Sequence, residues 1–393
     1  MGRFIYLDNA ATTYPKPERV YKAMDEANRR LAVNAGRGSY GLAKKASGMI
    51  EQTRKNIVRI AKAEEVAEVV FTPSATLACN QVLGGIDWKK GDVIYVSPYE
   101  HNAVMRVLHL LQQQYELEIE ELAIEPETLR MDVEKIRYQF SKRPPKAVVM
   151  SQVSNVTGYI IPWQTIAKEA KQYEAVVVVD GSQGLGLVPV QLRNAAVDFY
   201  IFAGHKTLYG PLGVGGYINN RGKGLKHLLA GGTGSDSLNL EMPEGITGYE
   251  PGSQNIVAIA GLLEATEEII AQSEEEQNLK AEQGLCGYLM ERLRKIKGVV
   301  LYSPIGMDDF GIEQRTGILA MNMEGYKAAD VGMILDEDYD IAVRTGYHCA
   351  SLIHKYLKDE DYAGVVRISI GRFNTKEEMD CLVKAVEEIA MGW

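Results

Sequence analysis

The sequence predicts an α/β protein built on a mostly parallel sheet with helices on both faces. Between about residues 65 and 220, short apolar runs rich in β-branched residues alternate with helical stretches. The runs contain almost no polar residues, which is typical of strands buried on both faces. This alternation predicts a doubly wound domain. The expected strands are 69–71, 93–96, 147–150, 176–179 and 199–202.

Chain length and the C-terminal pattern predict a second domain. The 393 residues exceed the roughly 250 to 300 at which a single core stops growing. After about residue 253 the pattern changes to long charged helices, then short strands and a final amphipathic helix ending near Trp393. We expect a large domain at residues 16–255 and a smaller α+β domain formed by residues 1–15 and 256–393.

Composition argues against several classes of protein. The 43 Lys and Arg against 52 Asp and Glu leave no basic excess for a nucleic-acid partner. No apolar run approaches the roughly 20 residues of a membrane span, and the N-terminus lacks the apolar stretch of a signal peptide. Cys79, Cys286, Cys349 and Cys381 are dispersed, which is typical of free thiols in a reducing compartment and not of a zinc site. We expect a cytoplasmic protein with no membrane or nucleic-acid partner and no bound metal.

Polar segments follow the expected strands. In doubly wound sheets, ligands bind beyond the carboxyl ends of the strands, so these segments are the candidates for a site. They are 72–76, 100–102, 154–155, 180–183 and 204–206.

Lys206 and Asp180 form the first candidate pair. Lys206 follows an apolar strand and precedes the glycine-rich stretch 210–216. A lysine in a partly dry pocket loses proton affinity and can form a Schiff base with an aldehyde. Asp180 ends a run of four valines, where a carboxylate needs a cationic partner. A lysine Schiff base with an aspartate facing a pyridinium nitrogen is the arrangement expected for pyridoxal 5'-phosphate. Asp180 as a metal ligand is the weaker alternative.

Two further segments suit that cofactor. Ser74, Ala75 and Thr76 begin a helix directly after a strand, where free N–H groups and hydroxyls attract an anion such as a phosphate. A plain helix cap explains one of these hydroxyls equally well. His101 can stack on a flat ring or move protons, although an isolated histidine is more often an ordinary hydrogen-bonded residue.

The stretch 36–41 matches G-x-G-x-x-G, the dinucleotide fingerprint, but a helical pattern precedes it instead of a strand. The fingerprint has mechanical meaning only directly after a strand. We therefore expect a glycine-rich turn near the site, with Arg37 reaching a ligand or a partner subunit.

Cys349 and Arg367 are the chemical features of the second domain. Cys349 lies in a small polar loop with His348 beside it and Arg344 nearby, and each neighbour would favour the reactive thiolate. The other three cysteines lie in helical, largely apolar stretches and are expected to be buried. Arg367 interrupts an apolar strand, where it serves either a structural ion pair or, as we favour, a substrate carboxylate.

These residues together resemble the class V aminotransferase group, and within it the cysteine desulfurase and selenocysteine lyase family. The resemblance runs from residues 6–13 to 367–375, and the loop 344–350 is similar to that of the second, sulfur-mobilisation subgroup. It implies the fold type I architecture of pyridoxal-phosphate enzymes, similar to aspartate aminotransferase. Ala203 and Ser253 depart from the Ser and Thr usual in relatives.

The resemblance also implies roles for individual residues. Lys206 would bind the cofactor and take the α-proton of the substrate, and Cys349 would accept its sulfur as a persulfide while alanine leaves. The substrate carboxylate would be held by Arg367 and Asn155. A homodimer with shared active sites is implied, in which one subunit's Ser253 segment reaches the cofactor phosphate of the other, and a sulfur-acceptor protein is a possible partner. The implied cofactor contacts are Lys206, Asp180, Gln183, His101, Thr76, Ala75, Asn155, His205 and Ser253.

The leading hypothesis is thus an L-cysteine desulfurase. A selenocysteine lyase acting on L-selenocysteine shares every one of these features, so the sequence does not separate the two. Another class V aminotransferase or lyase with an incidental Cys349, and a non-catalytic sulfur carrier of the same fold, are the remaining alternatives.

Overall fold

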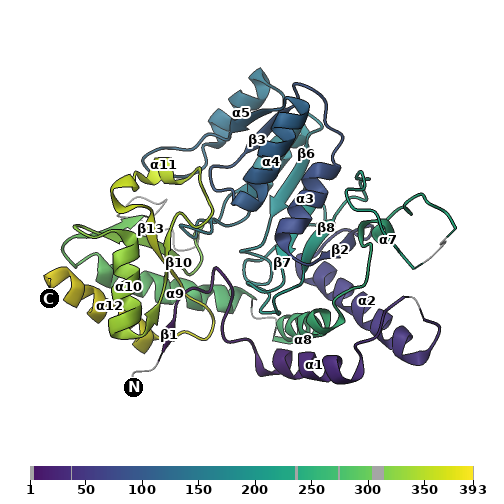
Figure 1. The fold of residues 1–393 in the computed structure, drawn as a ribbon. Helices are drawn as coiled ribbons and strands as arrows, with labels where there is room; N and C mark the ends of the chain where they lie inside the picture. Colours follow the sequence, from purple (N-terminus) through teal and green to yellow (C-terminus); the bar gives the residue numbers. More distant parts are fainter. Residues whose placement is uncertain (1–3, 37, 235–237, 273–274, 303–313, 393) are drawn as a thin grey trace.

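A computed structural model of the chain describes residues 4–36, 38–234, 238–272, 275–302 and 314–392. Arg37 lies outside these residues. Within them the chain forms a large and a small sheet, each with its own helices (Figure 1). In the view of Figure 1 the smaller domain, in green and yellow, lies beside the larger one, and both chain ends are on it.

The large sheet has seven strands in the order β2-β8-β7-β6-β5-β3-β4. From β7 through β4 every neighbouring pair is parallel, whereas β8 runs antiparallel to both β2 and β7. The predicted mostly parallel sheet is confirmed, and β4 and β8 are additions to the five predicted strands. The strands are β2 Glu68–Thr72, β3 Val93–Val96, β4 Glu118–Glu121, β5 Ala147–Ser151, β6 Val176–Asp180, β7 Phe199–Ala203 and β8 Gly215–Asn219.

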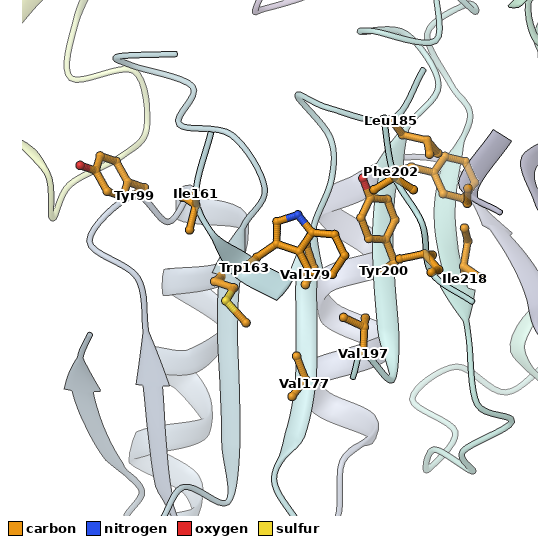
Figure 2. Close-up of a cluster of buried hydrophobic side chains, with 14 of the residues drawn as sticks. Tyr99, Ile161, Trp163, Val177, Val179, Leu185, Val197, Tyr200, Phe202 and Ile218 are labelled. Atoms are coloured by element: carbon orange, nitrogen blue, oxygen red, sulfur yellow. The ribbon is translucent and has the colours of Figure 1, made fainter. Parts of the chain in front are cut away.

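Helices cover both faces of this sheet. On β6, Val177 and Val179 point into one hydrophobic core and Val178 into the other, which explains why the strand carries no polar residue before Asp180. Figure 2 shows part of the first core, where Trp163 lies beside Val179 and Tyr200. The first core includes residues from α2 Gly41–Ala61, α5 Val133–Lys142, α6 Trp163–Lys171 and α8 Ile256–Gln272, and the second includes residues from α3 Ala75–Gly85 and α4 Asn102–Tyr115.

The smaller domain is a four-stranded antiparallel sheet in the order β12-β13-β10-β9, with its own hydrophobic core. The N-terminal segment belongs to it, because β1 pairs in parallel with β11 and Asp8 bridges to Ser369. Its elements are β1 Ile5–Tyr6, α9 Glu275–Leu293, β9 Val299–Tyr302, β10 Ile318–Met323, α10 Ala328–Tyr339, β11 Ile341–Ala342, β12 Arg344–Gly346, α11 His354–Leu357, β13 Val365–Ser369 and α12 Lys376–Met391.

Helix α8, which we assigned to the smaller domain, packs mainly on helices of the larger one. Its residues Ile259 and Leu262 are buried in the first core, and the helix packs on α2 and on α1 Glu18–Arg30. Residues 256–272 therefore pack mainly with the large domain, and Glu268 pairs with Arg372 of the smaller one at 2.5 Å. The apolar face of α8 packs against α1 and α2, which lie before residue 62. Sequence pattern alone does not reveal such a long-range contact.

Two of the three cysteines predicted to be structural, Cys79 and Cys286, are buried, but Cys381 is exposed. The prediction for Cys381 is wrong because α12 is amphipathic. Its buried side is formed by Met379, Leu382 and neighbouring residues, and Cys381 lies off that side. In the described part of the chain, no helix has both the length and the apolar composition needed to span a membrane.

Candidate active site

The strand ends converge on one cavity of about 230 Å³. Its walls come from both domains, because Arg344 and Arg367 of the smaller sheet face the residues that follow β3, β5, β6 and β7 of the larger one. The predicted site residues that line it are Ala75, Thr76, His101, Asn155, Asp180, Gln183, His205, Lys206 and Arg367.

Lys206 lies in a tight turn three residues beyond β7. Gly204 allows this turn, since a Cβ there would come within 2.7 Å of the Val214 carbonyl oxygen. Burial lowers the pKa of Lys206 to about 8, with the cations of Arg367 and Arg344 acting in the same direction and Asp180 opposing them. At pH 7 about a tenth of this amine is therefore uncharged, far more than for an ordinary lysine, which makes it able to act as a nucleophile or a base.

Asp180 is buried at the end of β6, and its Oδ1 accepts a hydrogen bond of 2.9 Å from the Ser182 backbone N–H. None of the ion pairs formed among the described residues involves this carboxylate. A buried carboxylate that faces a cavity and forms no ion pair is poised for a positively charged group of a ligand.

His101 caps the N-terminus of α4, and its Nδ1 accepts a hydrogen bond of 3.0 Å from the Ala103 N–H. Nε2 is then the nitrogen that carries the proton. Burial, with Lys206 as the next cause, lowers the pKa of His101 to about 4. The ring is neutral at physiological pH, which suits a flat contact or a hydrogen bond more than a charge interaction.

The start of α3 provides a place for an anion. Ser74 caps the helix through a hydrogen bond of 3.3 Å from the Leu77 N–H, and Ala75 and Thr76 follow on the cavity wall. Gly215 lets β8 approach this turn, because a Cβ there would lie 2.9 Å from the Ala75 nitrogen. The first N–H groups of an α-helix have no partner within the helix and attract a phosphate.

Two buried polar atoms on the cavity wall support a polar ligand. Ser182 Oγ and His205 Nδ1 are buried and have no hydrogen-bond partner among the described residues. Burial, followed by the charges of Lys206 and Lys16, lowers the pKa of His205 to about 4. Native proteins rarely leave such atoms unpaired, so a bound group is the natural partner. The amine, the carboxylate and the helix start together fit pyridoxal 5'-phosphate.

Arg367 is almost completely buried and forms the structural ion pair that was one of the two roles considered for it. Its Nη2 pairs with Asp8 Oδ1 at 2.6 Å, and its Nη1 donates to the Asn155 backbone oxygen at 3.0 Å. Its Nε has no hydrogen-bond partner in the described part of the chain. Gln183 also reaches the N-terminal segment, through a hydrogen bond of 2.8 Å from its Nε2 to the Ala10 oxygen.

Cys349 is exposed in a loop with an unusual backbone. Both His348 and Cys349 adopt a left-handed conformation, with φ of 47° and 55°, which costs roughly 1–2 kcal/mol for each residue other than glycine. Asn155 Nδ2 donates to the His348 oxygen at 2.8 Å, and the Asn102 N–H donates to the Cys349 oxygen at 2.6 Å. Arg344 Nη2 lies 3.7 Å from Cys349 Sγ. Since Arg344 and Asn155 line the cavity, the thiol is held beside its wall.

His348 does not act on the thiol as predicted. Its ring is buried and its Nε2 faces the Val365 oxygen at 3.1 Å. Burial, followed by the charge of Arg367, lowers the pKa of His348 to about 2, so the ring carries no charge that could favour the thiolate. Arg344 is the cation that contacts the Cys349 sulfur.

One predicted site residue in the described part of the chain, Ser253, lies away from the cavity. Ser253 is exposed, receives a hydrogen bond of 3.0 Å from Asn34 Nδ2 and lines a separate pocket with Leu229 and Tyr249. Arg37 is outside the described residues. Conversely, Asp8 and Asn102 were missed as site residues. Asp8 lies 359 residues from Arg367, and Asn102 acts through its backbone N–H, so neither position carries a signal in the sequence.

The model of the family Aminotransferase class-V matches residues 5–382. The chain belongs to this family. A cysteine desulfurase from Klebsiella pneumoniae (strain 342) is 33% identical over 98% of this chain and 93% of its own length. A probable cysteine desulfurase from Halalkalibacterium halodurans is 30% identical over 98% and 92%.

Solved structures of class V relatives agree with this assignment. The apo structure of a cysteine desulfurase from Thermococcus onnurineus NA1 has a TM-score of 0.88 and 28% identity, covering 99% of this chain and 95% of the other. A cysteine desulfurase from Escherichia coli in its S-sulfonic acid form has a TM-score of 0.84 and 27% identity, covering 99% and 94%. The predicted family and its fold are confirmed.

Proposed function

We propose that this chain is a pyridoxal 5'-phosphate-dependent cysteine desulfurase, which converts L-cysteine to L-alanine and takes the sulfur on Cys349 as a persulfide. One observation carries the proposal. The Lys206 amine and the unpaired Asp180 carboxylate share a cavity whose wall includes Arg344, the residue that contacts the exposed Cys349 thiol. The names of the relatives support the same reaction.

Each cofactor contact has a residue suited to it. Asp180 would hold the pyridine nitrogen, Lys206 the aldehyde carbon and His101 the ring, while the start of α3 and the free Ser182 and His205 atoms would serve the polar substituents. When bound, pyridoxal phosphate supplies an electron sink for the substrate's α-carbon.

The remaining steps belong to the chain. Arg367 and the Asn155 side chain would orient the substrate carboxylate at the boundary between the domains. The Lys206 amine accepts the α-proton, for which a pKa near neutrality is favourable. Cys349 thiolate then attacks the substrate sulfur. The new S–S bond forms as the Cβ–S bond breaks, and the substrate carbons leave as alanine after protonation.

The test is incubation of the purified holoenzyme with L-cysteine and excess dithiothreitol, with alanine and sulfide assayed together. We expect equal amounts of both products, and a loss of turnover in Cys349→Ser but not in Cys381→Ser, which removes the other exposed thiol. Undiminished sulfide release by Cys349→Ser would contradict the persulfide role. Keto-acid formation that survives the loss of Cys349 would indicate an aminotransferase instead, and a parallel assay with L-selenocysteine compares the two substrates.

The proposal includes a homodimer in the cytoplasm that passes sulfur to an acceptor protein. Ser253 faces solvent away from the cavity of its own chain, and Leu228, Leu229, Leu238 and Leu240 are exposed in the preceding segment, which suits burial by a second subunit. The exposure of Cys349 suits sulfur transfer to a second protein. The free thiols of the chain suit a reducing compartment. Light scattering of the purified protein tests the dimer, for which a monomer mass would be the contrary result.

A further inference from the structure

We propose that a buried His354–Asp359 pair is the positioning device that holds the Cys349 loop in its left-handed conformation and so places the thiol for attack. The proposal deepens the proposed function and rests on it for the reaction. Neither His354 nor Asp359 is among the site residues described above.

The pair is buried directly behind the loop. His354, at the start of α11, is 5% exposed and Asp359 is fully buried. His354 Nδ1 lies 2.5 Å from Asp359 Oδ2, and His354 Nε2 lies 3.0 Å from the backbone oxygen of Tyr347. The Tyr347 ring packs edge-on against the His354 ring with centroids 5.0 Å apart. The histidine thus connects a buried carboxylate to the backbone two residues before Cys349.

Both partners of the ring are hydrogen-bond acceptors. The Tyr347 oxygen also accepts a hydrogen bond of 2.9 Å from the Ala350 N–H, so the ring adds a second contact to a carbonyl that the loop itself uses. A buried carboxylate also requires a positive partner, and none of the Lys or Arg ion pairs among the described residues involves Asp359. The His354 ring therefore links the Asp359 carboxyl group to the Tyr347 carbonyl.

The loop needs such support because its backbone is unfavourable. His348 and Cys349 both have positive φ, and the hydrogen bonds that fix them come from other segments, namely the Asn155 side chain and the Asn102 N–H. These two bonds hold the loop from the large domain. The bond from His354 to Tyr347 holds the loop from within the smaller domain, so the loop is anchored to both domains. A strained conformation persists only where its surroundings over-determine it.

Three variants of the holoenzyme separate this role from general stability. His354→Gln keeps an N–H able to reach the Tyr347 oxygen, His354→Leu removes it, and His109→Leu removes an exposed histidine as the matched control. We expect kcat for L-cysteine to fall about 10- to 100-fold in His354→Leu, because a small misplacement of a reacting group costs that much. KM should change less than about twofold, since substrate binding does not involve the loop anchor. His354→Gln should recover most of kcat.

Hydrogen exchange without substrate provides a second measurement. Backbone amides of residues 345–357 should exchange faster in His354→Leu than in wild type and His109→Leu. If His354→Leu fails to fold, Asp359→Asn replaces it with the same expectations. Wild-type kcat in the folded variant, or unchanged exchange, would overturn the proposal. A wild-type enzyme that forms no alanine from cysteine would instead refute the proposed function, and the exchange experiment would still decide whether the pair holds the loop.

Discussion

The two chemical groups of this site are positioned in different ways. Asp180 ends β6 and Lys206 lies three residues beyond β7, and the backbones of both strands are fixed by the ladders of a sheet buried on both faces. Cys349 stands in a loop whose conformation depends on bonds from distant side chains and amides. The comparison shows that the Lys206 and Asp180 half of the site, for which we propose cofactor binding, lies at the edge of the sheet, whereas the Cys349 half, for which we propose sulfur acceptance, is held by tertiary contacts.

The strongest test of the sheet half is Lys206→Ala. We expect alanine formation to fall at least about 1,000-fold, because the variant loses both the nucleophilic amine and the base. Lys168→Ala, on the exposed side of α6, is the control and should match wild type. An activity within tenfold of wild type in Lys206→Ala, measured by alanine assay, would show that this half is not catalytic.

Asp180→Asn tests the affinity of the same half for the cofactor. Losing one partner of a buried charge pair costs roughly 2–5 kcal/mol, which predicts a dissociation constant for pyridoxal phosphate at least about 30-fold higher. Titration of the cofactor-free protein, followed by absorbance, measures it. Asp336→Asn on the exposed face of α10 is the control, and equal affinity in the two variants would contradict the pairing.

Arg367→Lys tests the proposed binding of the substrate carboxylate at the boundary between the two halves. A lysine keeps the charge but loses the planar fork that contacts Asp8 and Asn155 together. We expect KM for L-cysteine to rise about tenfold, as an Arg-to-Lys change loses a directed hydrogen bond to a charged group. Initial-rate kinetics measure KM, with Arg137→Lys on the surface as the control. An unchanged KM would leave Arg367 with the ion pair to Asp8 as its role.

The last prediction concerns the buried histidine of the loop and is measured as stability, not as activity. The pKa of His348 is lowered from 6.5 to about 2, so the unfolded chain binds this proton more tightly than the folded one. Stability from this group is complete above pH 6.5 and is lost as pH falls toward 2. Between pH 6.5 and 5 the loss is about 2 kcal/mol for one such group.

Urea unfolding at several pH values measures this effect. His348→Asn should lose less stability on acidification than wild type, whereas His109→Asn should behave like wild type. Burial lowers the pKa values of His101 and His205 to about 4. These two residues of the sheet half therefore also lose folding stability as pH falls from 6.5 to about 4. An acid response of His348→Asn equal to that of wild type would show that the loop histidine is not held neutral.

Sequence patterns were sufficient for the sheet half of the site. The valine run that ends at Asp180, and the apolar strand before Lys206, predict both the strands and the edge at which their side chains meet. They do not predict β8, because Gly215 and Gly216 lack the side chains by which a strand is usually detected, while the close packing of β8 is what demands glycine there.

The loop half shows where sequence reasoning ends. The motif around Cys349 indicates a reactive thiol. The sequence also suggests that His348 beside it is positively charged, but burial keeps this ring neutral. The anchors Asn102 and Asn155 precede the loop by about 200 residues or more, so their contacts with it cannot be inferred from spacing.

The sequence by itself determined the fold class, the parallel sheet, the Lys206 and Asp180 pair and the family, because these follow from local apolar patterns and short motifs. Only the tertiary structure decided that α8 packs with the large domain, that Asp8 pairs with Arg367, that His348 is neutral and that His354 anchors the Cys349 loop. The physical reason is that burial, charge pairing and hydrogen bonds to a strained loop depend on groups that folding brings together from distant parts of the chain.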